Sequence, residues 1–196
     1  MTNSSFVIDH MLSLRAQRNY GVAYFYFSVD RANEQSLHHV LSCLAKQLIA
    51  QANSLVGDVE RLYKESQNGT TAPTSDQLKI AISSIVKAKT FSHIFLVFDA
   101  FDECNAELRS SFLSLFKRMT DDGINVFVTS RPNIHEIHAS RSNATTIQLS
   151  ANEHDLRTYL EKRIDQNSLL LNVVSDYHRD GGEDVISTLI ETVNGM

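Results

Sequence analysis

Three carboxylates follow closely on an apolar run in the stretch HIFLVFDAFDEC, residues 93–104. Asp99 ends the run, and Asp102 and Glu103 come soon after it. Mg²⁺ prefers hard oxygen ligands and keeps several of its water molecules, so a single carboxylate at the end of a strand can hold the hydrated ion. We therefore expect Asp99 to hold a magnesium ion. We expect Glu103, with Asp102 as the second choice, to orient or polarise an attacking water molecule.

A second polar group follows the next apolar run, INVFV, at Thr129, Ser130 and Arg131. An arginine at the end of a neighbouring strand can neutralise the charge of a γ-phosphate. Both groups also have a simpler interpretation. Acidic residues are common in the first turn of a helix, where the helix dipole stabilises them, and Arg131 can equally be a surface residue. The occurrence of both groups after successive apolar runs favours a site.

The elements that must position these groups alternate between strands and helices. Runs of aromatic and β-branched residues predict strands, and apolar residues at helical spacing predict amphipathic helices. The predicted strands cover residues 22–30, 93–99, 124–132 and 145–150. The predicted helices cover residues 5–18, 34–51, 58–66, 76–89, 105–120, 153–165 and 183–193, with Asn33 capping the second and Ser75 or Asp76 the fourth.

The order of these elements predicts the fold class. Strands that are apolar along their whole length are buried on both faces, as in a parallel sheet. Alternation of such strands with helices indicates an α/β fold with helices on both faces of the sheet. Ligands of such sheets bind at the carboxyl ends of the strands. Both polar groups follow strand ends, so we expect them to lie together at that edge.

The composition excludes several classes of protein. The 196-residue chain has a formal net charge of -5 and no basic stripe, which argues against a nucleic-acid partner. Its apolar runs are too short to span a membrane, and its N-terminus lacks the features of a signal peptide. Cys43 and Cys104 lie far apart in the sequence and form no CxxC motif. We therefore expect them to be reduced thiols of a cytoplasmic protein. We do not expect Cys104 to be a nucleophile, because the neighbouring carboxylates disfavour its thiolate.

The motifs at the strand ends, taken with two others, resemble a known family. IFLVFDAFDEC resembles the Walker B segment of the NACHT-type signalling ATPases, in the form seen in many fungal proteins with a nephrocystin-3-like N-terminal domain. VFVTSRP resembles their sensor 1 strand, YGVAYFYFSVDR resembles their second strand, and IQLSANEHDLRTYLEKRI resembles the segment that leads out of the ATPase core. The resemblance covers nearly the whole chain, and its Walker B and sensor motifs occur in register.

The resemblance implies a three-layer P-loop NTPase fold and a role for each residue of the two groups. Asp99 would hold Mg²⁺, and Asp102 and Glu103 would form the catalytic acidic pair. Thr129 and Arg131 would contact the nucleotide, which is ATP or GTP in this family. Members of this NACHT-type (STAND) group couple nucleotide exchange to oligomerisation and signalling. Protein partners or self-association are therefore expected.

The phosphate-binding loop of this family has no counterpart in the sequence, which contains no GxxxxGK followed by Ser or Thr. We therefore expect a truncated module without the first strand and the phosphate loop. Residues 1–166 would be a partial NTPase core, and residues 167–196 the start of a following helical region. Such a chain would bind nucleotide weakly or not at all and would not be active alone. The alternative is a nucleotide-independent protein-interaction domain that associates with intact relatives.

Overall fold

The structure, a computed structural model, describes residues 3–54, 57–66, 71–132, 137, 144–149, 152–179 and 184–194. The chain forms two compact units, Met1–Asn143 and Ala144–Met196, and each is described by itself. The boundary expected between residues 166 and 167 divides the NTPase core of the family from the helical region that follows it. That boundary stays a prediction. Over the described ranges, no helix combines the length and the apolar character that a membrane span needs.

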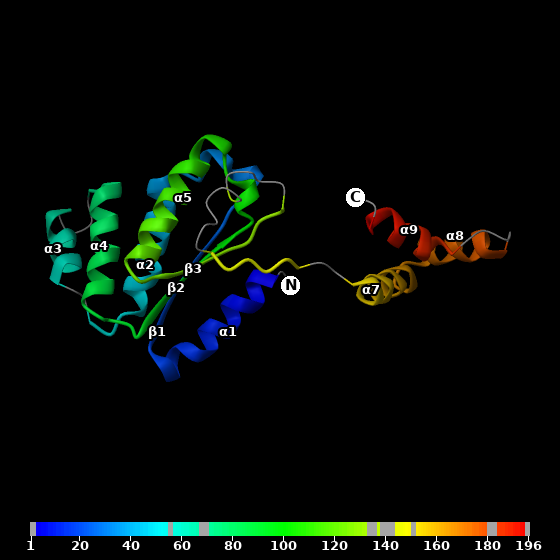
Figure 1. Ribbon diagram of the computed structural model, residues 1–196, viewed down its shortest axis with the longest axis horizontal. Coiled ribbons are helices and arrows are strands. Elements are labelled where there is room, and N and C mark those ends of the chain that lie inside the picture. The colour runs from blue at the N-terminus through cyan, green and yellow to red at the C-terminus, as the bar shows by residue number, and fades with distance from the viewer. Residues whose placement is uncertain are drawn as a thin grey trace. The chain divides into compact units, whose positions relative to one another are not determined.

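Strands and helices alternate in the first unit, and the second unit is helical over its described elements (Figure 1). The first unit contains α1 (Asn3–Arg18), β1 (Tyr20–Tyr26), η1 (Val29–Glu34), α2 (Leu37–Gln51), α3 (Gly57–Glu65), α4 (Ser75–Lys87), β2 (His93–Asp99), η2 (Phe101–Glu103), α5 (Ala106–Asp121) and β3 (Asn125–Val128). The second contains α7 (Glu153–Asp165), α8 (Ser168–Arg179) and α9 (Val185–Asn194).

The three strands form one parallel sheet in the order β1-β2-β3. Tyr26 pairs with Asp99 across β1 and β2, and Phe98 pairs with Val128 across β2 and β3. All three strands therefore end at the same edge. The predicted class is confirmed: the fold is α/β, with an all-parallel sheet flanked by helices, and is consistent with a P-loop-like architecture.

One face of the sheet carries the main hydrophobic core. Successive side chains of a strand point to opposite faces, so alternate residues of each strand meet the helices on this side. Helices α2 and α5 cover this face, α4 packs beside α2, and α3 packs against α4 (Figure 1). The strands contribute to this core the buried side chains of Ala23, Ile94, Leu96 and Phe98, and Phe27 adds its side chain directly after the end of β1.

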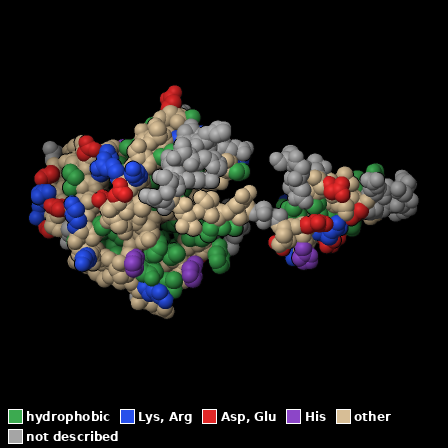
Figure 2. All heavy atoms as spheres, in the orientation of Figure 1, with side chains coloured by type: hydrophobic (Ala, Val, Ile, Leu, Met, Phe, Trp, Pro, Cys, Tyr) green, Lys and Arg blue, Asp and Glu red, His purple; other side chains and the backbone are tan. Residues whose placement is uncertain are grey.

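Helix α1 lies on the opposite face, where it contacts β1 and β2 (Figure 1). Ile8, Val22 and Val97 are buried in this unit but lie outside the main core cluster. The cover by α1 is partial, since Tyr26 is 45% and Phe127 39% exposed. Figure 2 shows hydrophobic side chains gathered beside α1, in agreement with this partial cover.

The outer edge of β1 is closed by two side chains of α2. The side-chain amide of Gln47 accepts a hydrogen bond from Tyr24 N at 3.1 Å and donates one to Tyr24 O at 2.9 Å. Gln51 makes the same pair of bonds with Val22, at 3.0 and 2.6 Å. These two glutamines, called here the edge glutamines, satisfy backbone groups that an edge strand normally leaves open.

Local hydrogen bonds place two helix starts differently from the sequence expectation. The predicted cap at Asn33 is wrong, because Asn33 lies in η1 and Ser36 caps α2. The Ser36 hydroxyl accepts a hydrogen bond from His39 N at 3.2 Å. Helix α4 is capped by Thr74, just before the predicted position, in a capping box with Gln77.

The strand predictions succeed where neighbouring strands pair and fail elsewhere. Strand β2 has its predicted bounds, whereas β1 and β3 are shorter than the predicted 22–30 and 124–132. The predicted strand 145–150 is wrong over its described residues, since 144–149 have no regular secondary structure. A β-branched run forms a strand only where another strand pairs with it, and here Ile147 is 75% exposed. Helix α8 was not predicted.

Candidate functional site

Asp99 ends β2 at the carboxyl edge of the sheet. Its carbonyl oxygen accepts a hydrogen bond from Phe27 N at 3.0 Å, which extends the contact with the β1 side. Ala100 follows in the left-handed region, with φ 53° and ψ 47°. This conformation is unfavourable for a residue with a Cβ. It turns the chain sharply out of the sheet and into η2, which carries Asp102 and Glu103.

Thr129 holds this turn from the end of β3. Its hydroxyl donates to Asp99 Oδ1 at 2.5 Å and accepts from Ala100 N at 3.0 Å. Its backbone N donates to Phe98 O and its carbonyl accepts from Phe101 N, both at 2.9 Å. Thr129 therefore fixes the orientation of the Asp99 carboxylate. Among the described residues, no hydrogen bond or ion pair engages the second oxygen, Oδ2, of Asp99.

Arg131 contacts both members of the acidic pair. Its Nε lies 3.3 Å from Asp102 Oδ2, and its Nη2 lies 3.9 Å from Glu103 Oε1. The Arg131 backbone N also donates to Asp102 Oδ1 at 3.2 Å. The Arg131 side chain is 77% exposed, so water screens the attraction and each ion pair contributes at most about 1 kcal/mol to stability. Its main effect is to neutralise the acidic pair within the chain.

Glu103 also connects the site to the end of β1. Its Oε2 accepts a hydrogen bond from Val29 N at 3.2 Å, at the start of η1. Contacts made by the predicted site residues thus join the segments that follow all three strands. The structure brings the five residues into two adjoining groups: Asp99 with Thr129, and Asp102 and Glu103 with Arg131. Their chemical roles stay predictions.

The short helix η2 is supported by a residue that the sequence did not single out. Arg109 donates to Asp102 O at 2.8 Å and to Cys104 O at 3.2 Å. Below, Phe101 is fully buried, with its ring 5.4 Å from that of Phe27. No spacing rule identifies Arg109, because its partners are backbone carbonyls whose positions depend on the turn.

Cys104 is unsuited to nucleophilic chemistry, for a reason different from the expected one. It is buried at the end of η2, where its backbone N–H caps the helix. Burial raises the pKa of the Cys104 thiol from 9.0 to about 11, although the nearby Arg109 charge opposes the shift. The thiol therefore stays protonated near neutral pH.

The donor set fits a magnesium ion only in part. Asp99 keeps one carboxylate oxygen that makes no hydrogen bond or ion pair with the described residues, and Mg²⁺ is commonly held by one or two carboxylates together with water. Asp102 and Glu103 do not fit as direct ligands, because both are paired with Arg131. In the described part of the chain, no group of three or more His, Cys, Asp or Glu residues could hold a metal ion.

Comparison with known families adds the decisive observation. The model of the family described as Nephrocystin 3, N-terminal, matches residues 2–131. The chain belongs to this family. The matched segment of this nephrocystin 3 N-terminal domain contains the whole sheet and ends at Arg131, so it includes all five predicted site residues. Neither the curated proteins nor the solved structures contain a match to the chain.

Proposed function

We propose that this nephrocystin 3 N-terminal domain is a NACHT-type (STAND) signal-transduction NTPase module, of the form found in fungal proteins. In its parent protein the module would act as a nucleotide-dependent oligomerisation switch in the cytoplasm. The observation that supports this most is the arrangement at the sheet edge. An acid ends the middle strand, an acidic pair follows it, and an arginine follows the neighbouring strand, all within the family match.

In this proposal each group has a separate task. Asp99, oriented by Thr129, would hold hydrated Mg²⁺, which would neutralise phosphate charge when bound. Glu103 and Asp102 would orient a water molecule. Arg131, whose side chain is mostly exposed, would be available to an anionic phosphate.

We further propose that the 196-residue chain binds nucleotide weakly or not at all by itself. The sequence has no GxxxxGK followed by Ser or Thr, the loop whose backbone N–H groups and lysine cradle phosphates. Arg131 is the one basic side chain that forms ion pairs with Asp102 or Glu103 among the described residues.

Calorimetric titration with Mg-ATP and Mg-GTP tests the binding proposal. We expect binding of the wild-type chain to be absent or weaker than micromolar, and any measurable binding to be lost in Asp99→Ala. Asp121→Ala, which removes one carboxylate at the end of α5, is the control for net charge. Micromolar binding that survives Asp99→Ala would contradict the assigned role of Asp99.

Hydrolysis is tested in a version of the domain to which a strand and phosphate loop are added. In that protein Glu103→Gln should retain ATP and lose turnover, because the amide cannot accept a proton from water. Glu107→Gln, at the start of α5, should leave turnover unchanged. Unchanged turnover in Glu103→Gln would remove Glu103 from the catalytic pair.

A second function is favoured by the ion pairs of Arg131. They neutralise the acidic pair without any ligand, so the site is electrostatically satisfied in the chain as it stands. This supports a nucleotide-independent interaction domain that associates with itself or with intact relatives. Size-exclusion chromatography with light scattering, with and without Mg-ATP, distinguishes the two. A complex with an intact relative that forms equally with and without Mg-ATP would favour the second function.

A further inference from the structure

A pocket of about 530 Å³ opens between α2, α3 and α4, on the helical side of the first unit. None of the described residues that line it belongs to the strand-end site. Pockets of about 300–1,000 Å³ with mostly apolar walls are the usual form of small-molecule sites. The pocket therefore has the size of a ligand site that is separate from the candidate nucleotide site.

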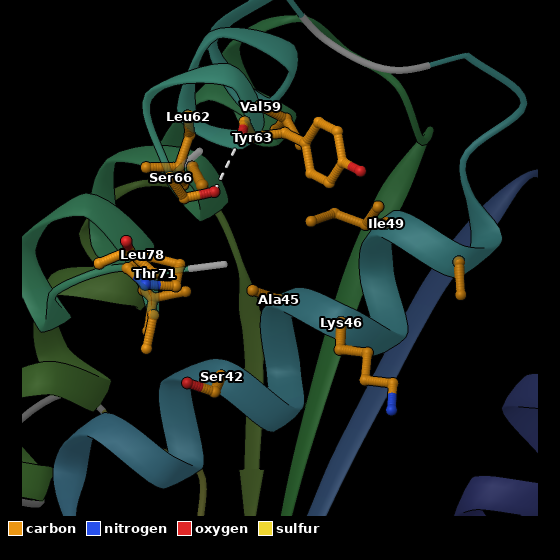
Figure 3. Close-up of a pocket in the computed structure, with 14 residues that line it drawn as sticks. Ser42, Ala45, Lys46, Ile49, Val59, Leu62, Tyr63, Ser66, Thr71 and Leu78 are labelled. Atoms are coloured by element: carbon orange, nitrogen blue, oxygen red, sulfur yellow. Dashed lines mark hydrogen bonds between the residues drawn. The ribbon is translucent and has the colours of Figure 1, made fainter. Parts of the chain in front are cut away.

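The walls of the pocket are mostly apolar and come from three helices, together with Ser66 and the segment 71–73 before α4 (Figure 3). Ala45 and Ile49 lie on α2, Leu62 and Tyr63 on α3, and Leu78 on α4. Figure 3 shows Ile49, Leu62 and Tyr63 around the open space, with the small Ala45 at its base. An alanine at the base leaves room that a longer side chain would fill. A ligand buried here would therefore be largely hydrocarbon.

The charge at the rim has one sign. Lys46 is the only charged side chain among the described residues that line the pocket. It lies at the edge in Figure 3 with its ammonium turned outward. No ion pair with Lys46 is found in the described part of the chain, whereas Arg61 and Lys64 on α3 are paired with carboxylates. The flexible stem of a lysine lets the ammonium reach a nearby anion.

We propose that this pocket binds a small amphipathic anion, namely a free medium-chain carboxylate. Its hydrocarbon chain fills the apolar space between the three helices, and its carboxylate stays at the rim, where the Lys46 ammonium neutralises it. A cation of the same length lacks this partner, and a short organic acid lacks the apolar contact. The site therefore selects for both chain length and charge.

Calorimetric titration of the whole 196-residue chain with decanoate, below its critical micelle concentration, tests the proposal. We expect one molecule to bind per chain. Octanoate should bind about tenfold more weakly, since each buried methylene contributes a factor of about three to four. Decyltrimethylammonium should bind more weakly than decanoate. Absence of decanoate binding, binding only above the micelle concentration, or equal binding of the cation would each overturn the proposal.

Variants locate the binding in the pocket. Ala45→Leu fills the base and should abolish decanoate binding in a chain that still melts cooperatively. If Ala45→Leu does not fold, Ser42→Leu fills the pocket from a partly exposed position on α2. Lys46→Met should weaken binding about fivefold, the size of one exposed ion pair. Lys117→Met on α5 removes the same charge elsewhere and should have no effect.

The variant results also have outcomes that contradict the proposal. Unchanged affinity in a folded variant with a filled base would place the ligand elsewhere. Equal losses in Lys46→Met and Lys117→Met would mean that net charge, and not contact with Lys46, attracts the anion.

Discussion

At the scale of single residues, Thr129 is the residue that holds the turn after β2. Four hydrogen bonds connect it to residues 98–101, and one of them orients the Asp99 carboxylate. The sequence indicated Thr129 as a nucleotide contact. The structure assigns it a clear structural task as well, and its contribution to stability can be measured without any ligand.

Thr129→Val should lower the free energy of unfolding by about 1–3 kcal/mol, because Ala100 N loses its acceptor and Asp99 loses its donor. Thr129→Ser keeps the hydroxyl and removes only a methyl group, so it should cost less than about 1 kcal/mol. Urea denaturation followed by circular dichroism measures both. Equal losses in the two variants would show that the hydroxyl does not hold the turn.

Ala100→Gly should increase the free energy of unfolding by about 0.5–1 kcal/mol. Glycine removes the left-handed strain at φ 53°, which outweighs the entropy that it adds to the unfolded chain. The matched control is Ala52→Gly, where the backbone is extended at φ -72° and ψ 134°. That change should lower the free energy of unfolding by about 0.5–1 kcal/mol. Destabilisation by both changes would mean that Ala100 carries no strain.

Residue spacing predicted which side chains would lie near one another, but not how they would pair. The order of two apolar runs was enough to place Asp102, Glu103 and Arg131 at one edge of the sheet. The pairing of Arg131 with both acids depends on the turn at Ala100. Nothing in the sequence marks that turn, because alanine is not a residue that normally adopts a left-handed conformation.

At the scale of elements, the edge glutamines of α2 replace a strand beside β1. Their replacement by methionine at both positions keeps length and flexibility and removes every amide bond to β1. We expect a loss of about 1–3 kcal/mol in the free energy of unfolding, because backbone groups of Val22 and Tyr24 lose their partners.

The same double variant should also associate more readily, because an open strand edge can pair with another chain. Gln17→Met, an exposed change on α1, is the control. Light scattering over a concentration series measures association. A double variant as stable and as monomeric as Gln17→Met would show that the side-chain amides do not protect the edge.

The elements of the first unit follow from patterns that are local in sequence. Helical periodicity and the aromatic runs predicted α1, α2, α5 and β2 because each buries side chains against a neighbour. The same logic failed at residues 145–150, where the pattern resembled a strand but 144–149 have none. Strand propensity mainly measures packing against neighbours. A short stretch of sequence does not show whether another strand is available to pair with it.

At the scale of the whole molecule, the two units should respond differently to acid. In the second unit, Asp184 accepts hydrogen bonds from the Ser187 hydroxyl at 2.6 Å and from Arg157 at 3.0 Å. These contacts lower the pKa of Asp184 from 3.8 to about 2. Its carboxylate therefore stabilises the folded unit above pH 3.8, and this contribution is lost as the pH falls toward 2.

Asp184→Asn should lower the protection of the α9 amides against hydrogen exchange at neutral pH, and it should remove the further loss of protection that the wild type shows as the pH falls from 3.8 toward 2. The first unit should be unaffected. Asp165→Asn, at the exposed end of α7, should change neither unit. Hydrogen exchange followed by mass spectrometry resolves the two units separately. A loss of α9 protection on acidification that is equal in wild type and Asp184→Asn would contradict the role of this carboxylate.

The edge glutamines also bear on the order in which the first unit folds. In the sequence, α2, α3 and α4 separate β1 from β2. Pairing between strands that are so distant along the chain is slow to form. Gln47 and Gln51 lie only 23 and 29 residues from their partners on β1. Helix α2 can therefore serve as a template on which β1 becomes extended before β2 arrives. If so, loss of Gln51 will slow refolding more than it hastens unfolding, and stopped-flow kinetics will show it as a high φ-value.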